Sequence, residues 1–226
     1  YSLIILILNI GFSSFIAPGN KSNILSIPLS AQEIASAGSI TGLNNSFIKF
    51  KNPVSQSSNQ RQIGYNFNTH FSNEYNSSII LFPQINANNG VYNFGLIYLS
   101  VPNIPDTRNL FSGQNSSIPD YNSISNFSFN QYGVLLNYSN EYNENIKYGV
   151  SLIPHFYNLE NYKAFGLIYN LGVSFKINAN IEYLMILNSL PGSFTIWDKS
   201  DTELFPLEFK NCIIYKVNNI DLFTNL

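Results

Sequence analysis

Residues 162–188 decide the fold, and they read YKAFGLIYNLGVSFKINANIEYLMILN. The odd positions of 165–175 are large and apolar, whereas the even positions of 164–174 are mostly small or polar. Alternation with a period of two is the pattern of a β-strand. The short polar link 176–179 and a second alternating run, 181–188, complete a predicted β-hairpin.

The two faces of this hairpin differ in an unusual way. The polar face of its first strand consists mainly of Gly166, Asn170, Gly172 and Ser174, and it holds no charged residue. A sheet face that meets water in a soluble sandwich carries many charges. We therefore expect the polar face to line the lumen of a β-barrel and the apolar face to point outward.

The composition supports a membrane protein that crosses the bilayer with strands. Charged residues make up 11% of the chain, against about 25% in an ordinary soluble domain. Beyond the first residues there is no run of about 18 apolar residues, which excludes a helical membrane protein. A transmembrane β-strand needs only about 9–11 residues, of which every second one is apolar.

Two further properties exclude other classes of protein. The formal net charge of -2 leaves no basic footprint for nucleic acid. Cys212 is the single cysteine, so the chain has neither an internal disulfide framework nor a cysteine zinc cluster.

The first residues resemble a secretory signal peptide. An apolar stretch at 3–10 precedes the small residues Gly11 and Ser13, which have the spacing of a cleavage site. We interpret residues 1–17 as the remnant of a signal peptide, so the predicted location is the bacterial outer membrane. The alternative is a short membrane anchor, but the stretch is too short to span a bilayer and Asn9 interrupts it.

Residues 18–60 lack the pattern of a strand. They contain Pro28, a small-residue run with a possible helical turn at 31–37, and the dipeptide Asn52-Pro53. We predict that this segment is a hatch or plug that lies in the barrel lumen or across its periplasmic mouth.

Residues 61–226 form the predicted barrel wall, an antiparallel up-and-down transmembrane β-barrel of about nine strands. In residues 126–138 the parity of Phe127 and Phe129 differs from that of the later apolar residues, which suggests a bulge near Asn130. The expected strands lie near 63–71, 78–83, 91–100, 126–138, 146–153, 162–175, 181–188, 207–216 and 219–226.

The connections between these strands differ in length. The long ones, 101–125 and 189–206, hold most of the charged loop residues, and 139–145, 176–179 and 217–218 are short. We expect every long connection at one end of the barrel and every short one at the other, because outer-membrane barrels have short periplasmic turns and longer extracellular loops. The charged residues of the long connections are Asp106, Arg108, Asp120, Asp198, Lys199, Asp201 and Glu203.

An odd strand number predicts that the barrel is incomplete. Bacterial outer-membrane barrels have an even number of strands. We therefore expect a curved open sheet in which the strand near 62–71 and the strand near 221–226 each lack an outer partner.

The alternation also predicts which side chains point where. Outward we expect Tyr132, Tyr138, Tyr148, Phe165, Tyr169, Phe175 and Tyr183, the ones near strand ends in interfacial girdles. Inward we expect Gly133, Gly149, Gly166 and Gly172. The candidate lumen residues are Asn66, His70, Asn137, Ser151, Ile153, His155, Asn170 and Glu182, and for each a hydrogen bond to a neighbouring lumen residue is favoured over contact with a ligand.

Catalysis and cofactor binding have no support in the sequence. His70 and His155 are the two histidines, and no signature of a nucleophile with an orienting partner surrounds either one. Two separated histidines without clustered carboxylates lack the spacing of metal ligands. We expect no enzyme activity, no cofactor and no metal.

Residues 31–55 resemble the amino-terminal signature of the PorV/PorQ family of FadL-like outer-membrane barrels. The matching residues are Gly38 in a Gly/Ala-rich opening and Asn52-Pro53 at the close, with Val54 where the family usually has Ala. Residues 101–107, VPNIPDT, resemble the first long extracellular loop of that family, and 165–188 resemble one of its hairpins.

This resemblance implies a monomeric outer-membrane barrel with an amino-terminal hatch, in contact with membrane lipid. Barrels of this kind pass or bind hydrophobic small molecules, or serve type IX secretion by receiving proteins at the cell surface. The alternative from the residues alone is a structural or adhesive β-sandwich on the cell surface. The uncharged polar face and the expected sorting of the loops argue against that alternative.

Overall fold

The structure is a computed structural model that describes residues 24–25, 30, 33, 46–55, 63–70, 75–87, 90–108, 124–199, 201–217 and 220–225. The predicted signal peptide, Gly38 and most of the possible helical turn at 31–37 lie outside these residues.

The described residues form one antiparallel sheet and a short 3-10 helix. None of the helices among them is long and apolar enough to cross a bilayer. The elements are η1 (Ser46–Phe50), β1 (Gly64–His70), β2 (Tyr75–Leu81), β3 (Ile85–Ala87), β4 (Gly90–Asp106), β5 (Ser125–Asn143), β6 (Ile146–Leu159), β7 (Tyr162–Lys176), β8 (Ile181–Asn188), β9 (Phe194–Trp197), β10 (Thr202–Leu204), β11 (Glu208–Val217) and β12 (Ile220–Asn225).

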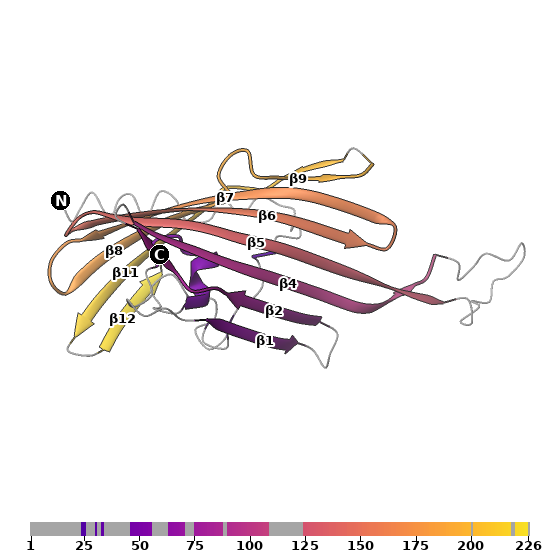
Figure 1. Ribbon diagram of the computed structural model, residues 1–226, viewed down its shortest axis with the longest axis horizontal. Coiled ribbons are helices and arrows are strands. Elements are labelled where there is room, and N and C mark those ends of the chain that lie inside the picture. Colours follow the sequence, from indigo (N-terminus) through magenta and orange to yellow (C-terminus); the bar gives the residue numbers. More distant parts are fainter. Residues whose placement is uncertain are drawn as a thin grey trace, which may run out of the picture.

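Nine of these strands follow one another across the sheet in the order β1-β2-β4-β5-β6-β7-β8-β11-β12. They are the nine strands that the sequence predicts, so the antiparallel up-and-down arrangement is confirmed. Figure 1 shows the sheet curving, with η1 on its inner side. Among the described residues β1 and β12 are the two edges of this path and do not pair with each other, so the sheet is open, as predicted.

Three short strands were not predicted. β3 pairs with β4, and β9 pairs with both β10 and residues 164–167 of β7. Each has only three or four residues, which is too few for an alternation to be recognised. The connection between β8 and β11 therefore contains the hairpin β9–β10. Its strand β9 pairs with residues 164–167 of β7, beyond the stretch of β7 that pairs with β8.

The predicted bulge near Asn130 is wrong in its position. The register shift lies in β4, between Val101 and Ile104, opposite the unbroken strand β5. Asn103 in the shifted stretch has a φ of 55°. Phe129 keeps the inward parity of β5 because its ring packs edge-on against Tyr157, with 5.8 Å between ring centroids. The aromatic residue that suggested a bulge is thus a core residue.

The predicted sorting of the connections holds only in part. The strand ends at Asp106, Ser125, Asn188 and Glu208, which the two long connections join, lie at one end, here called the loop end, and the turns at 144–145 and 177–180 lie at the other, the turn end. However, β6 and β7 are joined at the loop end by a turn of two residues, Glu160-Asn161. Glu160 has a φ of 54°, and this left-handed residue makes the tight turn possible.

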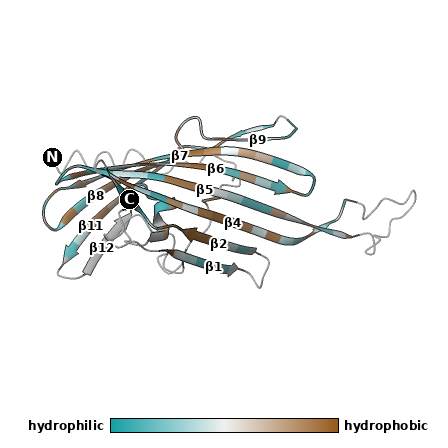
Figure 2. Ribbon diagram, viewed as in Figure 1, coloured by the Kyte–Doolittle hydropathy of each residue, from teal (hydrophilic) through white to brown (hydrophobic). Residues whose placement is uncertain are grey.

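The two faces of the sheet follow the predicted parity. On β7 the even positions from Ala164 to Ser174 are buried, and the odd positions are exposed or half-buried. Gly133, Gly149, Gly166 and Gly172 all lie on the buried face, here called the inner face, whereas the predicted tyrosines and phenylalanines lie on the opposite, outer face. Figure 2 shows hydrophobic segments along the middle of the long strands, where the outer face carries its aliphatic residues.

The core lies on the inner face. Its main cluster combines residues of the sheet with Ile24, Leu25 and Phe50, which come from the amino-terminal segment. A second cluster joins Val54 to β8 and β11. The sheet residues of the main cluster are Ile79, Leu81, Ile97, Leu135, Ile153, Tyr157, Ala164 and Ile168, with Phe205 from the β10–β11 connection.

Candidate functional site

A row of polar side chains crosses the inner face from β4 to β8. Asn93 pairs with Asn137, Asn137 with Ser151, and Ser151 with Asn170. The pairing of Leu171 with Leu187 places Asn188 next in line. All five side chains of this asparagine row are at most 4% exposed. A face built from amides and a hydroxyl is costly to bury unless its groups form hydrogen bonds.

The amino-terminal segment supplies hydrogen bonds to the first half of the row. Lys49 Nζ donates to Asn93 Oδ1 at 2.5 Å, and Asn93 Nδ2 donates to Asn137 Oδ1 at 2.9 Å. Asn137 Nδ2 then donates to the carbonyl oxygen of Pro53 at 3.0 Å. These bonds fix residues 46–55, here called the plug segment, against β4 and β5.

Glycines on the inner face provide the room for the plug segment. A Cβ atom on Gly149 would lie 2.2 Å from Pro53 O, and one on Gly172 would lie 2.6 Å from Val54 Cγ2. Both distances are far below van der Waals contact, so the backbone of the sheet and the plug segment meet directly. Those glycines were predicted to point inward, and the close approach of Pro53 and Val54 explains why no side chain fits there.

The turn at Asn52-Pro53 has its own local support. Asn52 Oδ1 accepts from the backbone N–H of Val54 at 3.0 Å, and Asn52 O accepts from Ser55 N at 3.2 Å. An asparagine side chain that bonds to the backbone two residues later is a common turn-former. Asn52 and Pro53, the residues that resemble the close of the PorV/PorQ signature, thus shape the part of the plug segment that touches Gly149.

A buried ion pair holds a second point of the amino-terminal segment. Lys51 Nζ donates to Glu33 Oε1, and both side chains are less than a tenth exposed. Ser30 Oγ accepts from the backbone N–H of Glu33 at 3.1 Å. Burial lowers the pKa of Lys51, and the nearby Glu33 carboxylate offsets only part of this effect. Removing either partner would leave an uncompensated buried charge, which is strongly destabilising.

Lys49 makes the stability of the protein depend on pH. Burial lowers its pKa from 10.5 to about 8, because the charged ammonium group loses hydration. The unfolded chain therefore binds more protons than the folded chain between about pH 8 and pH 10.5. Below about pH 8 the charged, buried Lys49 lowers the free energy of unfolding by its full amount. As the pH rises through that window, this penalty is removed and the free energy of unfolding increases.

We expect the free energy of unfolding in detergent micelles to increase by about 1–3 kcal/mol between pH 8 and pH 10.5 owing to Lys49. Urea titrations of the wild type and of Lys49→Met at several pH values would measure this contribution as a difference. Lys147→Met serves as a control because that ammonium is partly exposed, in an ion pair with Glu141. An equal pH dependence in wild type and Lys49→Met would contradict the assignment.

His155 is a packed and hydrogen-bonded residue of the inner face. Its Nε2 lies 2.8 Å from Thr195 Oγ1 of β9, and its ring lies 4.8 Å from that of Tyr157, centroid to centroid. The ring passes over Gly166, where a Cβ atom would lie 2.3 Å from His155 Nε2. No part of the side chain is exposed. These contacts match the expectation that a lumen residue bonds to a neighbour.

The other candidate lumen residues are spread over the sheet. Glu182 lies near the turn end, where its carboxylate accepts from Ser174 Oγ and lies 3.5 Å from Lys216 Nζ. Asn66 is half-buried on β1, and the side chain of His70 lies outside the described part of the structure. Asn170 Oδ1 accepts from Ser189 N at 2.9 Å. The sheet thus brings Asn137, Ser151 and Asn170 together in the asparagine row and leaves the others apart.

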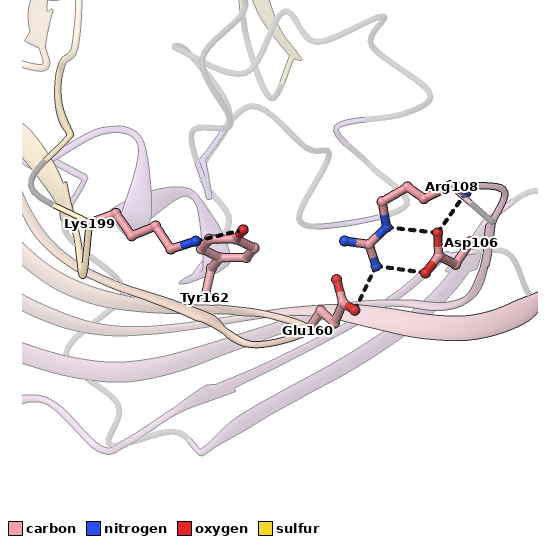
Figure 3. A network of polar contacts seen from close by, with 5 residues as sticks. All are labelled: Asp106, Arg108, Glu160, Tyr162 and Lys199. Carbon is pink, nitrogen blue, oxygen red and sulfur yellow. Dashed lines mark hydrogen bonds and ion pairs between the residues drawn. The ribbon is translucent and has the colours of Figure 1, made fainter. Parts of the chain in front are cut away.

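At the loop end, charged residues tie three connections together (Figure 3). Arg108 binds Asp106 through two nitrogens, at 2.8 and 2.6 Å, and reaches Glu160 Oε1 at 2.6 Å. This lowers the pKa of Asp106 to about 2, so the ion pair persists until the pH falls far below 3.8. Beside it, Lys199 Nζ donates to Tyr162 OH at 2.9 Å and lies 4.2 Å from the ring centroid.

The outer face carries two rows of aromatic residues, and the band between them is mostly aliphatic, with Phe94 and Tyr169 as its aromatic members. Phe165 and Phe175 on β7 are ten residues apart, which is roughly 33 Å along a strand and roughly 25 Å in height at the tilt of about 40° usual in membrane barrels. On β5, Tyr132 and Tyr138 are only six residues apart, so the rows converge there. The turn-end row is Tyr92, Tyr138, Tyr148, Phe175, Tyr183 and Tyr215, and the loop-end row is Tyr98, Tyr132, Phe156 and Phe165.

Sequence reasoning missed the residues that hold the plug segment. Lys49 and Asn93 form the first bond of the network, and Thr195 binds His155. The one available signal was Lys49 itself, a charged residue between the apolar Ile48 and Phe50. Its partner lies 44 residues away, which no local pattern reveals.

The described residues contain no group of three or more His, Cys, Asp or Glu side chains that could hold a metal ion. Comparisons with protein-family models, with curated proteins and with solved structures find no match.

Proposed function

We propose that this protein is an outer-membrane β-barrel protein without enzymatic activity, whose curved sheet faces lipid on its outer side and holds its own amino-terminal segment on its inner side. The observation that carries this proposal is the apolar character of the outer face. Exposed positions of this face hold residues such as Leu136, Val150 and Phe156, whereas the buried inner face holds the asparagine row beside the apolar core. The face of an antiparallel sheet that meets water is polar instead.

The aromatic rows support the same proposal. Tyr and Trp concentrate at the two interfaces of a bilayer, and barrels show an apolar band about 25 Å tall between aromatic girdles. The rows on β7 have about this separation. The alternative, an adhesive β-sandwich, gives no reason for an outer face with this banding.

Within this class, we favour a docking role at the cell surface over passage of hydrophobic molecules, in line with the PorV-like resemblance to type IX secretion. The plug segment and the main core cluster fill the inner face between β2 and β8. The ion pairs of Asp106, Arg108 and Glu160 order the loop end, where a secreted protein would be received.

This proposal predicts that the protein stays in membranes after a carbonate wash and migrates faster on gels when it is not heated. Liposomes that contain the refolded protein should take up no more of a long-chain apolar solute than empty liposomes. Release by carbonate would reject the membrane assignment. Retention together with solute uptake would keep the membrane assignment and favour passage over docking.

A further inference from the structure

A groove of about 230 Å³ lies on the outer face, at the loop-end aromatic row. Its walls are Tyr98 and Leu96 of β4, Tyr132 and Val134 of β5, and Phe156 of β6. At about 30 Å³ for a group the size of a water molecule, this volume holds roughly eight such groups. The groove therefore has the volume of a short segment of one hydrocarbon chain.

The groove lies over an interruption of the sheet. The ladder between β5 and β6 pairs Gly133 with His155 and Leu136 with Leu152, but it pairs none of the residues in between. Pro154 occupies this stretch of β6, and proline has no N–H to donate to a ladder. The ladder is thus interrupted beneath the groove, and its aromatic walls are held from the sides, with 5.0 Å between the ring centroids of Phe156 and Phe165 and 5.0 Å between those of Tyr98 and Tyr132.

One end of the groove is polar and rich in hydrogen-bond acceptors. Tyr98 OH and Ser100 Oγ each lie 2.9 Å from Asn130 Oδ1. Because an amide oxygen only accepts, both hydroxyls donate to it, and their own oxygens keep lone pairs free to accept. Asn130 Nδ2 donates one of its two hydrogens to Ser128 Oγ at 3.1 Å, and the other N–H is able to donate to a hydroxyl oxygen of a guest.

The charges and donors at this polar end select the kind of head group. The residues that line the groove and its polar end carry no ionised side chain, so a phosphate would be bound without a counter-charge. A head group with hydroxyls supplies the donors that the Tyr98 and Ser100 oxygens lack, whereas an ester or a phosphate supplies only further acceptors.

We propose that this groove, together with the hydroxyls of Tyr98 and Ser100, is a binding site for an uncharged membrane lipid with a hydroxylated head group, such as a monoacylglycerol. The acyl chain lies along Leu96, Val134 and Phe156, and the head hydroxyls donate to Tyr98 and Ser100 at the interface. This site rests on the proposed membrane function, because it requires the outer face to meet lipid.

Fluorescence quenching by brominated lipids tests the site. Phe156→Trp places a reporter in the groove, and Phe175→Trp places a matched reporter in the turn-end row, outside it. Both variants retain Trp197, the single native tryptophan, whose signal is subtracted with the parent protein. Each variant is refolded into phosphatidylcholine vesicles that contain increasing fractions of either brominated monoacylglycerol or brominated phosphatidylcholine.

We expect the Phe156→Trp reporter to be half-quenched by the monoacylglycerol at a mole fraction about tenfold lower than by phosphatidylcholine, a preference of about 1.4 kcal/mol. The Phe175→Trp reporter should show no difference between the two lipids. Adding Val134→Phe to fill the groove, or Ser100→Ala to remove a polar contact, should reduce the preference at the first reporter.

Other outcomes separate the lipid site from the membrane function. Equal quenching by the two lipids at both reporters would overturn the site and leave the membrane-facing sheet intact. A preference that survives Val134→Phe would also overturn the site, since the chain would then lie elsewhere. Absence of quenching at either reporter would overturn both the site and the proposed function.

Discussion

Replacing Gly149 with alanine is expected to detach the plug segment from the sheet. The new Cβ atom would lie 2.2 Å from Pro53 O and 3.0 Å from Val54 N, both of which are backbone atoms. Backbone cannot rotate away as a side chain can, so the turn at Asn52-Pro53 must shift. The shift also removes the hydrogen bond from Asn137 to Pro53 O. We expect a loss of about 2–4 kcal/mol in the free energy of unfolding.

Two measurements check this expectation. Urea unfolding in detergent micelles gives the change in stability, and limited trypsin digestion reports access to Lys49 and Lys51, which are buried in the folded protein. Gly64→Ala is the matched control, because its Cβ would approach only side-chain atoms: Phe47 Cζ at 3.1 Å, at the end of a side chain that is able to turn, and Leu81 Cβ at 3.5 Å, which is ordinary contact. That variant should lose no more than about 0.5 kcal/mol. Equal stability and protease resistance in Gly149→Ala would show that the plug segment does not depend on this contact.

An arginine in place of Leu136 should disrupt the protein more than an arginine at a more exposed site on the same strand. Leu136 pairs with Leu152 and Phe94 in the band between the aromatic rows. Tyr142 lies at the turn end of β5 and is 76% exposed. In a bilayer, an arginine costs about 2–4 kcal/mol at the midplane and about 0–1 kcal/mol near an interface.

Folding of Leu136→Arg and Tyr142→Arg into lipid vesicles, followed by urea titration, measures this difference directly. We expect Leu136→Arg to be the less stable by about 2–3 kcal/mol. In a protein surrounded by water, a position such as Leu136, 36% exposed, would accept the long arginine side chain with its charge in solvent. Similar stabilities for the two variants would therefore count against a lipid-facing outer side.

The sequence was sufficient to predict the parts of the fold that depend on local alternation. The hairpin of β7 and β8 and the inward direction of Gly149 and Gly172 follow from a period of two, which every strand carries within its own residues. Outer aromatics such as Phe165 were assigned correctly for the same reason. The misplaced bulge shows the limit of this reasoning, because the parity of Phe129 was explained by its contact with Tyr157 across the sheet and not by a local irregularity.

The contacts that make the candidate site could not be predicted in this way. Asn170 and His155 were selected by parity, but their partners Ser189 and Thr195 belong to a connection whose strand β9 pairs with β7. Lys49 was overlooked because a buried lysine is rare, and its hydrogen bond to Asn93 depends on the position of that residue in the sheet.

The network between the plug segment and the sheet also sets an order of events during synthesis. Lys49 and Pro53 leave the ribosome before their partners, because Asn93 follows Lys49 by 44 residues and Asn137 follows Pro53 by 84. The hairpins of β5, β6 and β7 close over turns of a few residues, so their loop-closure entropy is small, whereas that of the plug contacts is larger. The plug segment, which is made before the strands it contacts, is therefore among the last parts to acquire its native contacts. Until then Phe50 and Val54 remain exposed apolar residues, which favour aggregation.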